Sequence, residues 1–173
     1  MKANRESAEK ELYKPIRKVL ADEFQRRFGR ECYLEVTANG VFSETIKRVV
    51  RHDIVFKFLG RSISPDLTGF VPRKSLTLLE PSNIEDFITV EIKREKVTPQ
   101  DIYQAKMYGD LFQAKYALLI SPEPIPEEIR RLQQQLFISN RFMSGWVVYI
   151  GQWEVMAGSG FVTMWFPESP FNY

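Results

Sequence analysis

The stretch from residue 87 to residue 121 constrains the fold most, because its pattern is that of a strand, a helix and a second strand. Residues 87–92 form an apolar run rich in strand-forming side chains, and residues 116–121 form a wholly apolar run that ends at Pro122. Between them, Thr98 and Pro99 are typical of an N-cap and a first helical position, which predicts a helix to about residue 112. A helical crossover places its two strands side by side and parallel, so the stretch predicts an α/β domain.

The segment before this crossover predicts a long helix followed by strands. In residues 6–28, apolar side chains recur every three or four positions, and Gly29 is a suitable end for the helix. The last two of the predicted strands read as a hairpin, and residues 42–51 fit either a strand or a short helix. The strands are predicted at residues 31–38, 54–58 and 62–71.

The segment after the crossover predicts a helix at about residues 127–138 and then further strands, with turns at Gly151-Gln152 and at residues 158–160. Aromatic residues in strands usually pack in a core or an interface, so we interpret three tryptophans as a packed extension or a dimer contact rather than as base-stacking groups. These are Trp146, Trp153 and Trp165. The whole chain, residues 1–173, is then one α/β domain. Its mixed central sheet is flanked by helices, with a core at about residues 6–140 and an aromatic β extension at about 145–166.

Composition excludes several classes of function. The net charge of +2 is too small to hold a polyanion without a local basic surface. The single cysteine, Cys32, and the single histidine, His52, exclude a disulfide framework and a zinc site built from several such ligands. Asp53 follows His52, but no serine or cysteine nucleophile stands in a recognisable setting, so we interpret His52 as structural or surface-exposed. Without an apolar run of membrane-spanning length, the sequence predicts a cytoplasmic protein that does not contact membranes.

Glu91 and Lys93 are charged side chains in a predicted core strand, where packing does not explain them. They are two residues apart, so they point to one face, and charged groups are rarely buried unless paired or bound to a metal. Asp66 follows Pro65 on a neighbouring predicted strand. Two carboxylates suit Mg²⁺ or Mn²⁺ with a phosphate substrate, and a lysine beside them can orient water or neutralise charge on the phosphate. The alternatives are a solvent-facing ion pair for Glu91 and Lys93, and turn chemistry for Pro65-Asp66.

Helical phase selects one acidic residue of the first helix. The apolar stripe is centred near Ile16, with Glu9 on the stripe and Glu11 on the opposite side. Of Glu6, Glu9 and Glu11, we therefore predict that Glu9 faces the body of the protein. The alternative is that Glu9 only interacts favourably with the helix dipole.

Together these residues resemble a known family. Pro65-Asp66, Glu91-Ile92-Lys93 and an upstream helical Glu9 resemble the PD-(D/E)XK, or restriction-endonuclease-like, nuclease superfamily. Gln104 and Tyr108 resemble the Gln-x-x-x-Tyr motif of its RecB-like branch. The family fold is a helix, three strands, a crossover helix and a further strand, which is the order predicted over about two thirds of this chain.

The resemblance implies a role for each matching residue. The three carboxylates would bind Mg²⁺ or Mn²⁺ and the lysine would assist the nucleophile, which makes the catalytic residues Glu9, Asp66, Glu91 and Lys93. Gln104 and Tyr108 would lie beside them, toward substrate or metal-bound water. They are also neighbours on one helix face, although Tyr108 fits equally well as a buried core aromatic. Arg94 and Lys96 flank the tripeptide and are predicted to bind phosphate, unless they belong to a solvated surface of mixed charge.

The sequence thus predicts a Mg²⁺-dependent nuclease that hydrolyses phosphodiester bonds in DNA. A homodimer would supply one site for each strand of a duplex. Two other interpretations stay open. One is a nucleic-acid-binding or assembly domain on the same scaffold that does not cut, and the other is hydrolysis of a different phosphoester.

Overall fold

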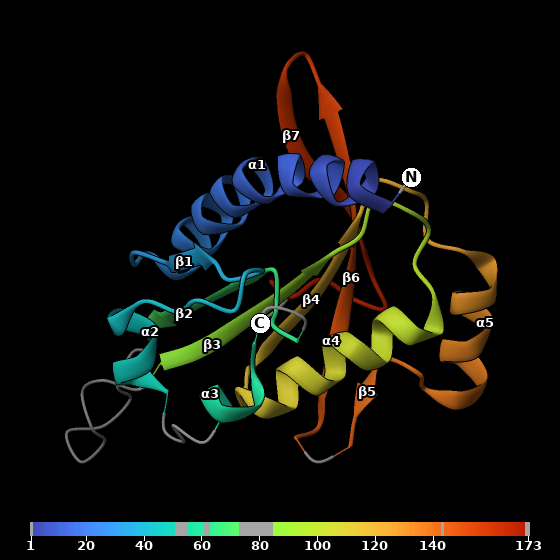
Figure 1. Cartoon of the computed structure of the whole chain (residues 1–173). Helices are drawn as coiled ribbons and strands as arrows, with labels where there is room; N and C mark the ends of the chain where they lie inside the picture. The colour runs from blue at the N-terminus through green and yellow to red at the C-terminus, as the bar shows by residue number, and fades with distance from the viewer. Residues whose placement is uncertain (1, 51–54, 61–62, 73–84, 143, 172–173) are drawn as a thin grey trace.

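The computed structural model describes residues 2–50, 55–60, 63–72, 85–142 and 144–171. The side chains of residues 2–9, 72 and 85 lie outside the described part. The described segments form a layered α/β domain in which helices lie on both sides of a central sheet (Figure 1). The predicted fold class is therefore confirmed as an α/β domain with a mixed sheet flanked by helices.

Within the described residues, the central sheet contains seven strands in the order β1-β2-β3-β4-β6-β5, with β7 paired to β6. The first three strands are antiparallel to one another, whereas β3, β4 and β6 are parallel neighbours. The parallel pairing of β3 with β4 is the one that the crossover predicts. The strands are β1 (Tyr33–Val36), β2 (Leu67–Pro72), β3 (Glu85–Ile92), β4 (Tyr116–Ser121), β5 (Asn140–Arg141), β6 (Trp146–Met156) and β7 (Ser159–Phe166).

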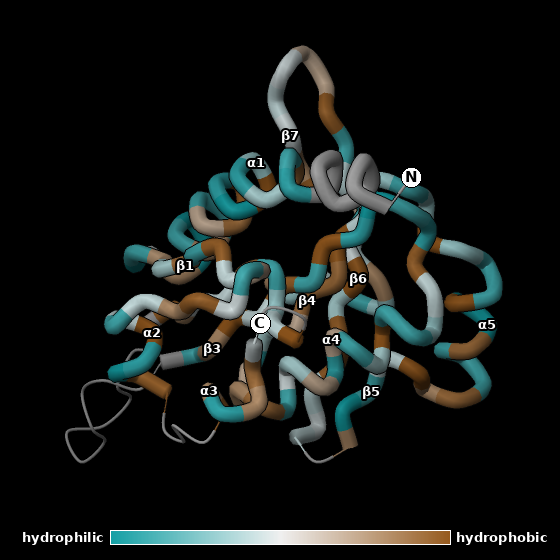
Figure 2. The backbone as a smooth tube through the Cα atoms, viewed as in Figure 1, coloured by the Kyte–Doolittle hydropathy of each residue, from teal (hydrophilic) through white to brown (hydrophobic). Residues whose placement is uncertain are grey.

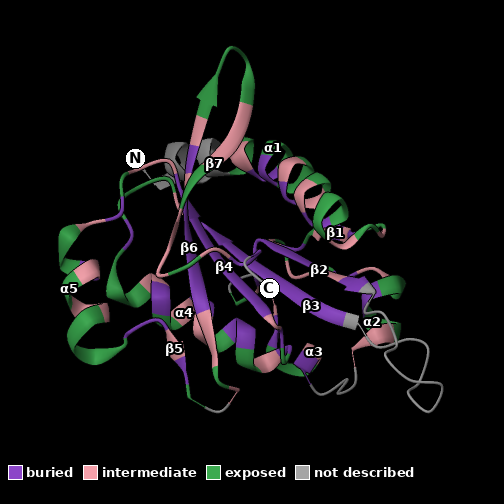
Figure 3. Cartoon of the chain, turned by 180° about the vertical axis from the view of Figure 1, so that it is seen from behind, coloured by how far each residue is buried: buried purple, intermediate pink, exposed green. Residues whose placement is uncertain are grey.

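Helix α1 covers one face of the sheet, and α4 and α5 cover the other. The helices are α1 (Lys2–Phe28), α2 (Glu44–Val49), α3 (Val55–Phe58), α4 (Pro99–Leu111) and α5 (Glu127–Leu136). Strand β4 explains the arrangement, because Leu118 packs in the cluster under α1 while Leu119 packs in the cluster with α4 and α5. Alternate side chains of one strand point to opposite faces, so a strand covered on both sides is apolar throughout. Figures 2 and 3 show this as hydrophobic, buried strands between helices.

Helix α4 begins where its local sequence predicts. The Thr98 hydroxyl accepts a hydrogen bond from the Asp101 amide, and the Asp101 carboxylate accepts one from the Thr98 amide, which is a capping box. Pro99 occupies the first helical position, where its missing N–H leaves no donor unsatisfied. The predicted helices at residues 6–28 and 127–138 are confirmed as α1 and α5, and residues 42–51 contain the short helix α2.

Three local predictions are wrong, and one of them is the strand at residues 62–71, which begins only at Leu67 as β2. Residues 54–58 were expected as a strand, but Val55–Phe58 forms helix α3, with Val55 and Leu59 one turn apart and both buried. A short apolar run does not distinguish the two structures, and packing decides. Gly151-Gln152 is not a turn but part of β6, with a bulge between Gln152 and Trp153. The Trp165 ring lies 2.9 Å from where a Cβ of Gly151 would stand, so the glycine permits close approach.

The strands predicted at about residues 145–166 are present as β6 and β7, which form a hairpin, but β6 is an inner strand of the central sheet between β4 and β5. Trp153 is buried in the core under α1, and Trp146 and Trp165 are half-buried. The tip of the hairpin is exposed and lies beyond α1 (Figure 3). Among the helices of the described residues, none combines the length and the apolar composition that a membrane crossing requires.

Cys32 lies in the core under α1 with 8% of its surface exposed, and burial raises the pKa of its thiol to about 12. At pH 8 only about one thiol in ten thousand is then ionised, and the thiolate is the reactive form. We expect Cys32 in the folded protein to stay unmodified by Ellman's reagent at pH 8 and to react completely in denaturing urea. Rapid stoichiometric reaction without denaturant would contradict this placement.

Candidate active site

Two buried carboxylates, Asp66 and Glu91, lie where β2 begins and β3 ends. In the antiparallel register Leu67 lies opposite Val90, so the same register extended by one residue places Asp66 opposite Glu91. Asp66 is 7% exposed and Glu91 is 5% exposed. One Asp66 carboxylate oxygen accepts a hydrogen bond of 2.7 Å from the Ile92 amide, which fixes the aspartate beside this end of β3.

Asp66 does not lie inside a strand, as residues 62–71 had predicted, but immediately before β2. Its position is set by Thr37, which follows β1. The Thr37 amide donates to the Asp66 backbone carbonyl at 2.8 Å, and its hydroxyl donates to the Pro65 carbonyl at 2.8 Å. Thr37 is fully buried and its hydroxyl also contacts that of Thr68 at 2.9 Å. Pro65 has no N–H for a strand ladder, so these bonds hold the segment instead.

Lys93 stands between two acidic side chains. Its Nζ lies 2.7 Å from Glu91 Oε1 and 3.6 Å from Asp101 Oδ1, and its side chain is 23% exposed. Burial alone lowers the pKa of Lys93, but the charges of Glu91, Asp101 and Asp66 outweigh burial, so the pKa is raised above its usual value. Lys93 is therefore a cation at neutral pH. It can orient a water molecule or neutralise an anion, but it has no free lone pair with which to accept a proton.

Helix α4 supplies the polar groups that complete this cluster. Asp101, Gln104 and Tyr108 lie three and four residues apart and so on one face of the helix. Lys93 Nζ donates to Gln104 Oε1 at 3.5 Å, and Gln104 Nε2 donates to the Tyr108 hydroxyl at 3.2 Å. The chain of contacts thus runs from the carboxylates through Lys93 into α4.

The Tyr108 side chain is 1% exposed and packs against α2 and α3 residues in the core. Burial raises the pKa of its hydroxyl, as do Glu91 and Asp66, while the Gln104 hydrogen bond and Lys93 partly offset them. The hydroxyl is therefore protonated at neutral pH. The prediction of a buried core aromatic is confirmed, and the hydroxyl accepts from Gln104, while a role of Tyr108 toward substrate stays a prediction.

Asp101 also belongs to the cluster, although no sequence pattern assigned it to the site. One carboxylate oxygen closes the capping box with Thr98, and the other faces Lys93. The spacing of Asp101 to Gln104 and Tyr108 is the signal that would have found it. Thr37 was also missed, and no local pattern marks it, because its contacts exist only once β1 pairs with β2.

The remaining predicted site residues are not brought into this cluster by the described contacts. Glu11 is exposed, as predicted, whereas the side chains of Glu6 and Glu9 lie outside the described part of α1. Arg94 and Lys96 are exposed on the chain between β3 and α4. Residues 51–54, with His52 and Asp53, also lie outside the described residues.

The oxygen donors of Asp66 and Glu91 are of the kind that a hard divalent cation prefers, but they come from only two carboxylates. Among the described side chains, no group of three or more aspartate, glutamate, histidine or cysteine residues is placed to hold an ion. Asp66 and Glu91 provide carboxylate oxygens, and Mg²⁺ binds through one or two carboxylates with water and substrate phosphate filling its other positions. The residues present therefore fit such an ion.

Comparisons of the chain with protein-family models, with curated proteins and with solved structures found no match. What the cluster can do chemically therefore follows from its own residues. Two buried carboxylates, one cation and an amide–hydroxyl pair at the ends of two inner strands are groups of the kind that bind a divalent ion and an anionic substrate.

Proposed function

We propose that this protein is a Mg²⁺-dependent nuclease that hydrolyses phosphodiester bonds in DNA. The observation that carries the proposal is the placement of Asp66 opposite Glu91, with Lys93 2.7 Å from the Glu91 carboxylate. Burying two carboxylates costs free energy, and a nearby cation offsets part of that cost. The resemblance to the PD-(D/E)XK superfamily assigns these same three residues to catalysis.

Asp66 and Glu91 would hold Mg²⁺ or Mn²⁺, with Glu9 as the third predicted ligand. When bound, such an ion polarises a phosphoryl oxygen and lowers the pKa of a coordinated water. Lys93, held as a cation between Glu91 and Asp101, orients the attacking water and balances the negative charge that grows on the phosphate. Neutralising that charge is worth most in a site from which water is excluded.

Gln104 and Tyr108 position Lys93. The Gln104 side-chain oxygen accepts from the lysine ammonium, and its amide donates to the Tyr108 hydroxyl, which the core holds in place. A long lysine side chain has several rotatable bonds, so partners on α4 reduce its freedom before substrate arrives. Arg94 and Lys96, exposed next to the site, are proposed to contact neighbouring phosphates of the strand.

The test is a cleavage assay on fluorescently labelled single-stranded and duplex DNA with Mg²⁺, with Mn²⁺ and with EDTA. We expect cleavage with either ion, none in EDTA, and a loss of roughly 10²-fold or more for Lys93→Met, which keeps the length of the side chain without its charge. Cleavage that persists in EDTA, or that Lys93→Met leaves unchanged, would overturn the proposed mechanism. DNA binding without any cleavage would instead favour a domain that binds nucleic acid and does not cut.

A further inference from the structure

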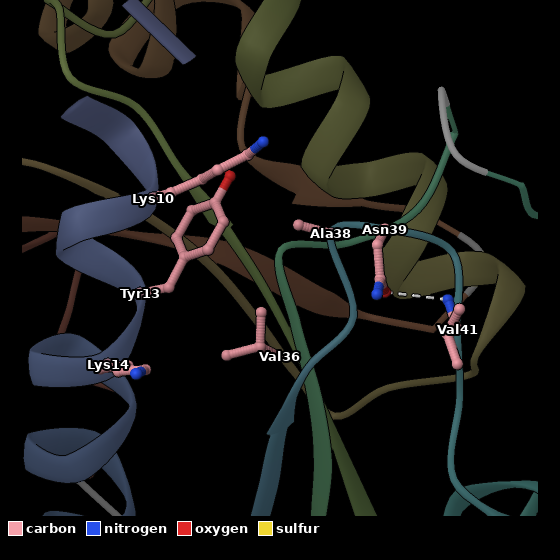
Figure 4. A pocket seen from close by; sticks show the side chains of 7 residues that line it. All are labelled: Lys10, Tyr13, Lys14, Val36, Ala38, Asn39 and Val41. Atoms are coloured by element: carbon pink, nitrogen blue, oxygen red, sulfur yellow. Dashed lines mark hydrogen bonds between the residues drawn. The ribbon is translucent and has the colours of Figure 1, made fainter. Parts of the chain in front are cut away.

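A cavity of about 720 Å³ lies between α1 and the chain that follows β1 (Figure 4). Its volume is within the range of roughly 300–1,000 Å³ that is usual for pockets holding small ligands. One wall comes from α1 and consists of Lys10, Tyr13 and Lys14, which lie on one helix face. The opposite wall comes from residues between Val36 and Val41.

The cavity combines an apolar wall with positive charge. Val36 is 38% exposed and Val41 is 66% exposed, although each is a large aliphatic side chain. Figure 4 shows the Tyr13 ring and the Lys10 side chain opposite Ala38, on the far side of the cavity. Among the described residues that line the cavity, two are lysines and none is acidic. An apolar surface beside two cations suits a ligand with a flat hydrophobic part and a negative charge.

The cavity and the candidate active site are linked along the chain through Thr37. Val36 and Ala38 line the cavity on either side of this residue, and the Thr37 amide donates to the Asp66 carbonyl at 2.8 Å. The segment that holds the Asp66 backbone is thus the same segment that forms one wall of the cavity.

We propose that the cavity binds one unpaired nucleotide of the DNA strand, next to the cleavage position. Its base packs on Val36, Val41 and Tyr13, and Lys10 and Lys14 contact the adjacent phosphates. A base in a duplex is stacked and paired and has to leave the helix to enter a pocket, which costs free energy. The substrate is thus a single strand, or a strand with an unpaired end, in preference to a blunt duplex. This inference rests on the proposed nuclease function.

The test measures binding of the full-length protein in EDTA, so that no cleavage occurs, by the fluorescence anisotropy of a short labelled oligonucleotide. We expect the single strand to bind more tightly than the same sequence as a blunt duplex.

Val41→Asp places a negative charge on an exposed wall residue and is expected to weaken single-strand binding by about tenfold or more, the scale of one base–protein interaction. Lys10→Glu and Lys14→Glu are expected to weaken binding similarly. Each should also reduce the salt dependence of binding by about 0.7 in log–log slope for every phosphate that the variant no longer neutralises.

Lys18→Glu is the matched control, because Lys18 is exposed on the same helix and does not line the cavity. Lys18→Glu makes the same change of net charge as Lys10→Glu. Because it acts away from the cavity, we expect a much smaller loss of affinity. Equal losses from Lys18→Glu and Lys10→Glu, unchanged binding by Val41→Asp, or tighter binding of the blunt duplex would each overturn the proposal. A cleavage assay tests the nuclease function separately from the cavity. If the expected binding pattern is found but neither the wild type nor any variant cuts DNA, the cavity assignment stands and the proposed nuclease function is wrong.

Discussion

Glu91→Gln is expected to reduce Mg²⁺-dependent cleavage by about 10³-fold or more. The substitution keeps the size of a buried side chain but removes the charge that lies opposite Asp66 and 2.7 Å from Lys93. Charge stabilisation by a bound metal is worth several kcal/mol, and each 1.4 kcal/mol is about a factor of ten in rate. The measurement is the single-turnover cleavage rate of labelled DNA, with the melting temperature recorded to show that the variant is folded.

The same strand offers a matched control in Asp86. It is a buried carboxylate, 6% exposed, and it pairs with Lys115 at 3.6 Å, as Glu91 pairs with Lys93. Five residues of extended strand separate it from Glu91, a distance of about 17 Å. Asp86→Asn should therefore destabilise the fold about as much as Glu91→Gln while leaving the cleavage rate near that of wild type. If both variants lost activity in parallel, the effect of Glu91→Gln would be one of folding, and the site assignment would fail.

Gly69→Ala is expected to cause the largest loss of stability from a single added methyl group. A Cβ at Gly69 would stand 2.0 Å from the backbone oxygen of Tyr33 and 2.9 Å from the Cα of Leu34, across the β1–β2 pair. Backbone cannot rotate away as a side chain can, so the two strands have to separate. We expect a cost of about 3 kcal/mol, at the upper end of overpacking effects, and a fall in melting temperature of about 6–12 °C.

Gly60→Ala is the control for this substitution. Among the described residues, its chain neighbours aside, a Cβ at Gly60 meets no atom within 4 Å, and Gly60 is not among the glycines with positive φ. The added methyl group there restricts the unfolded chain and should leave the melting temperature unchanged or raise it slightly, by the equivalent of roughly 0.4–1 kcal/mol. A melting temperature for Gly69→Ala equal to that of Gly60→Ala would show that β1 and β2 are not packed as described.

The parts of the fold that the sequence predicted well are those with local physical signals. Helix α4 starts at Thr98 because hydroxyl, carboxylate and proline all satisfy the first turn. Strand β4 is recognisable because both its faces are covered and its run is apolar up to the terminal serine. Residues 54–58 carried no such signal, and the helical form of Val55–Phe58 depends on Val55 and Leu59 packing in the core.

The candidate site likewise contains contacts that the sequence predicts and contacts that it does not. The Glu91–Lys93 pair was predictable, because alternation along a strand fixes a shared face. The contact between Lys93 and Asp101 was not, since it depends on how α4 lies against β3. Thr37 is the extreme case. Its role comes entirely from partners that are about thirty residues away in the chain, Pro65, Asp66 and Thr68.

Thr37 also has a thermodynamic consequence. One buried residue holds the Asp66 backbone and separates the two residues, Val36 and Ala38, that line the cavity beside α1. Occupancy of the cavity and occupancy of the carboxylates then act on the same short segment. If filling the cavity orders that segment, an ion at Asp66 and Glu91 binds more tightly, and by reciprocity the ion tightens binding in the cavity by the same factor. Under the proposed function, a DNA strand would thereby help to assemble the proposed metal site.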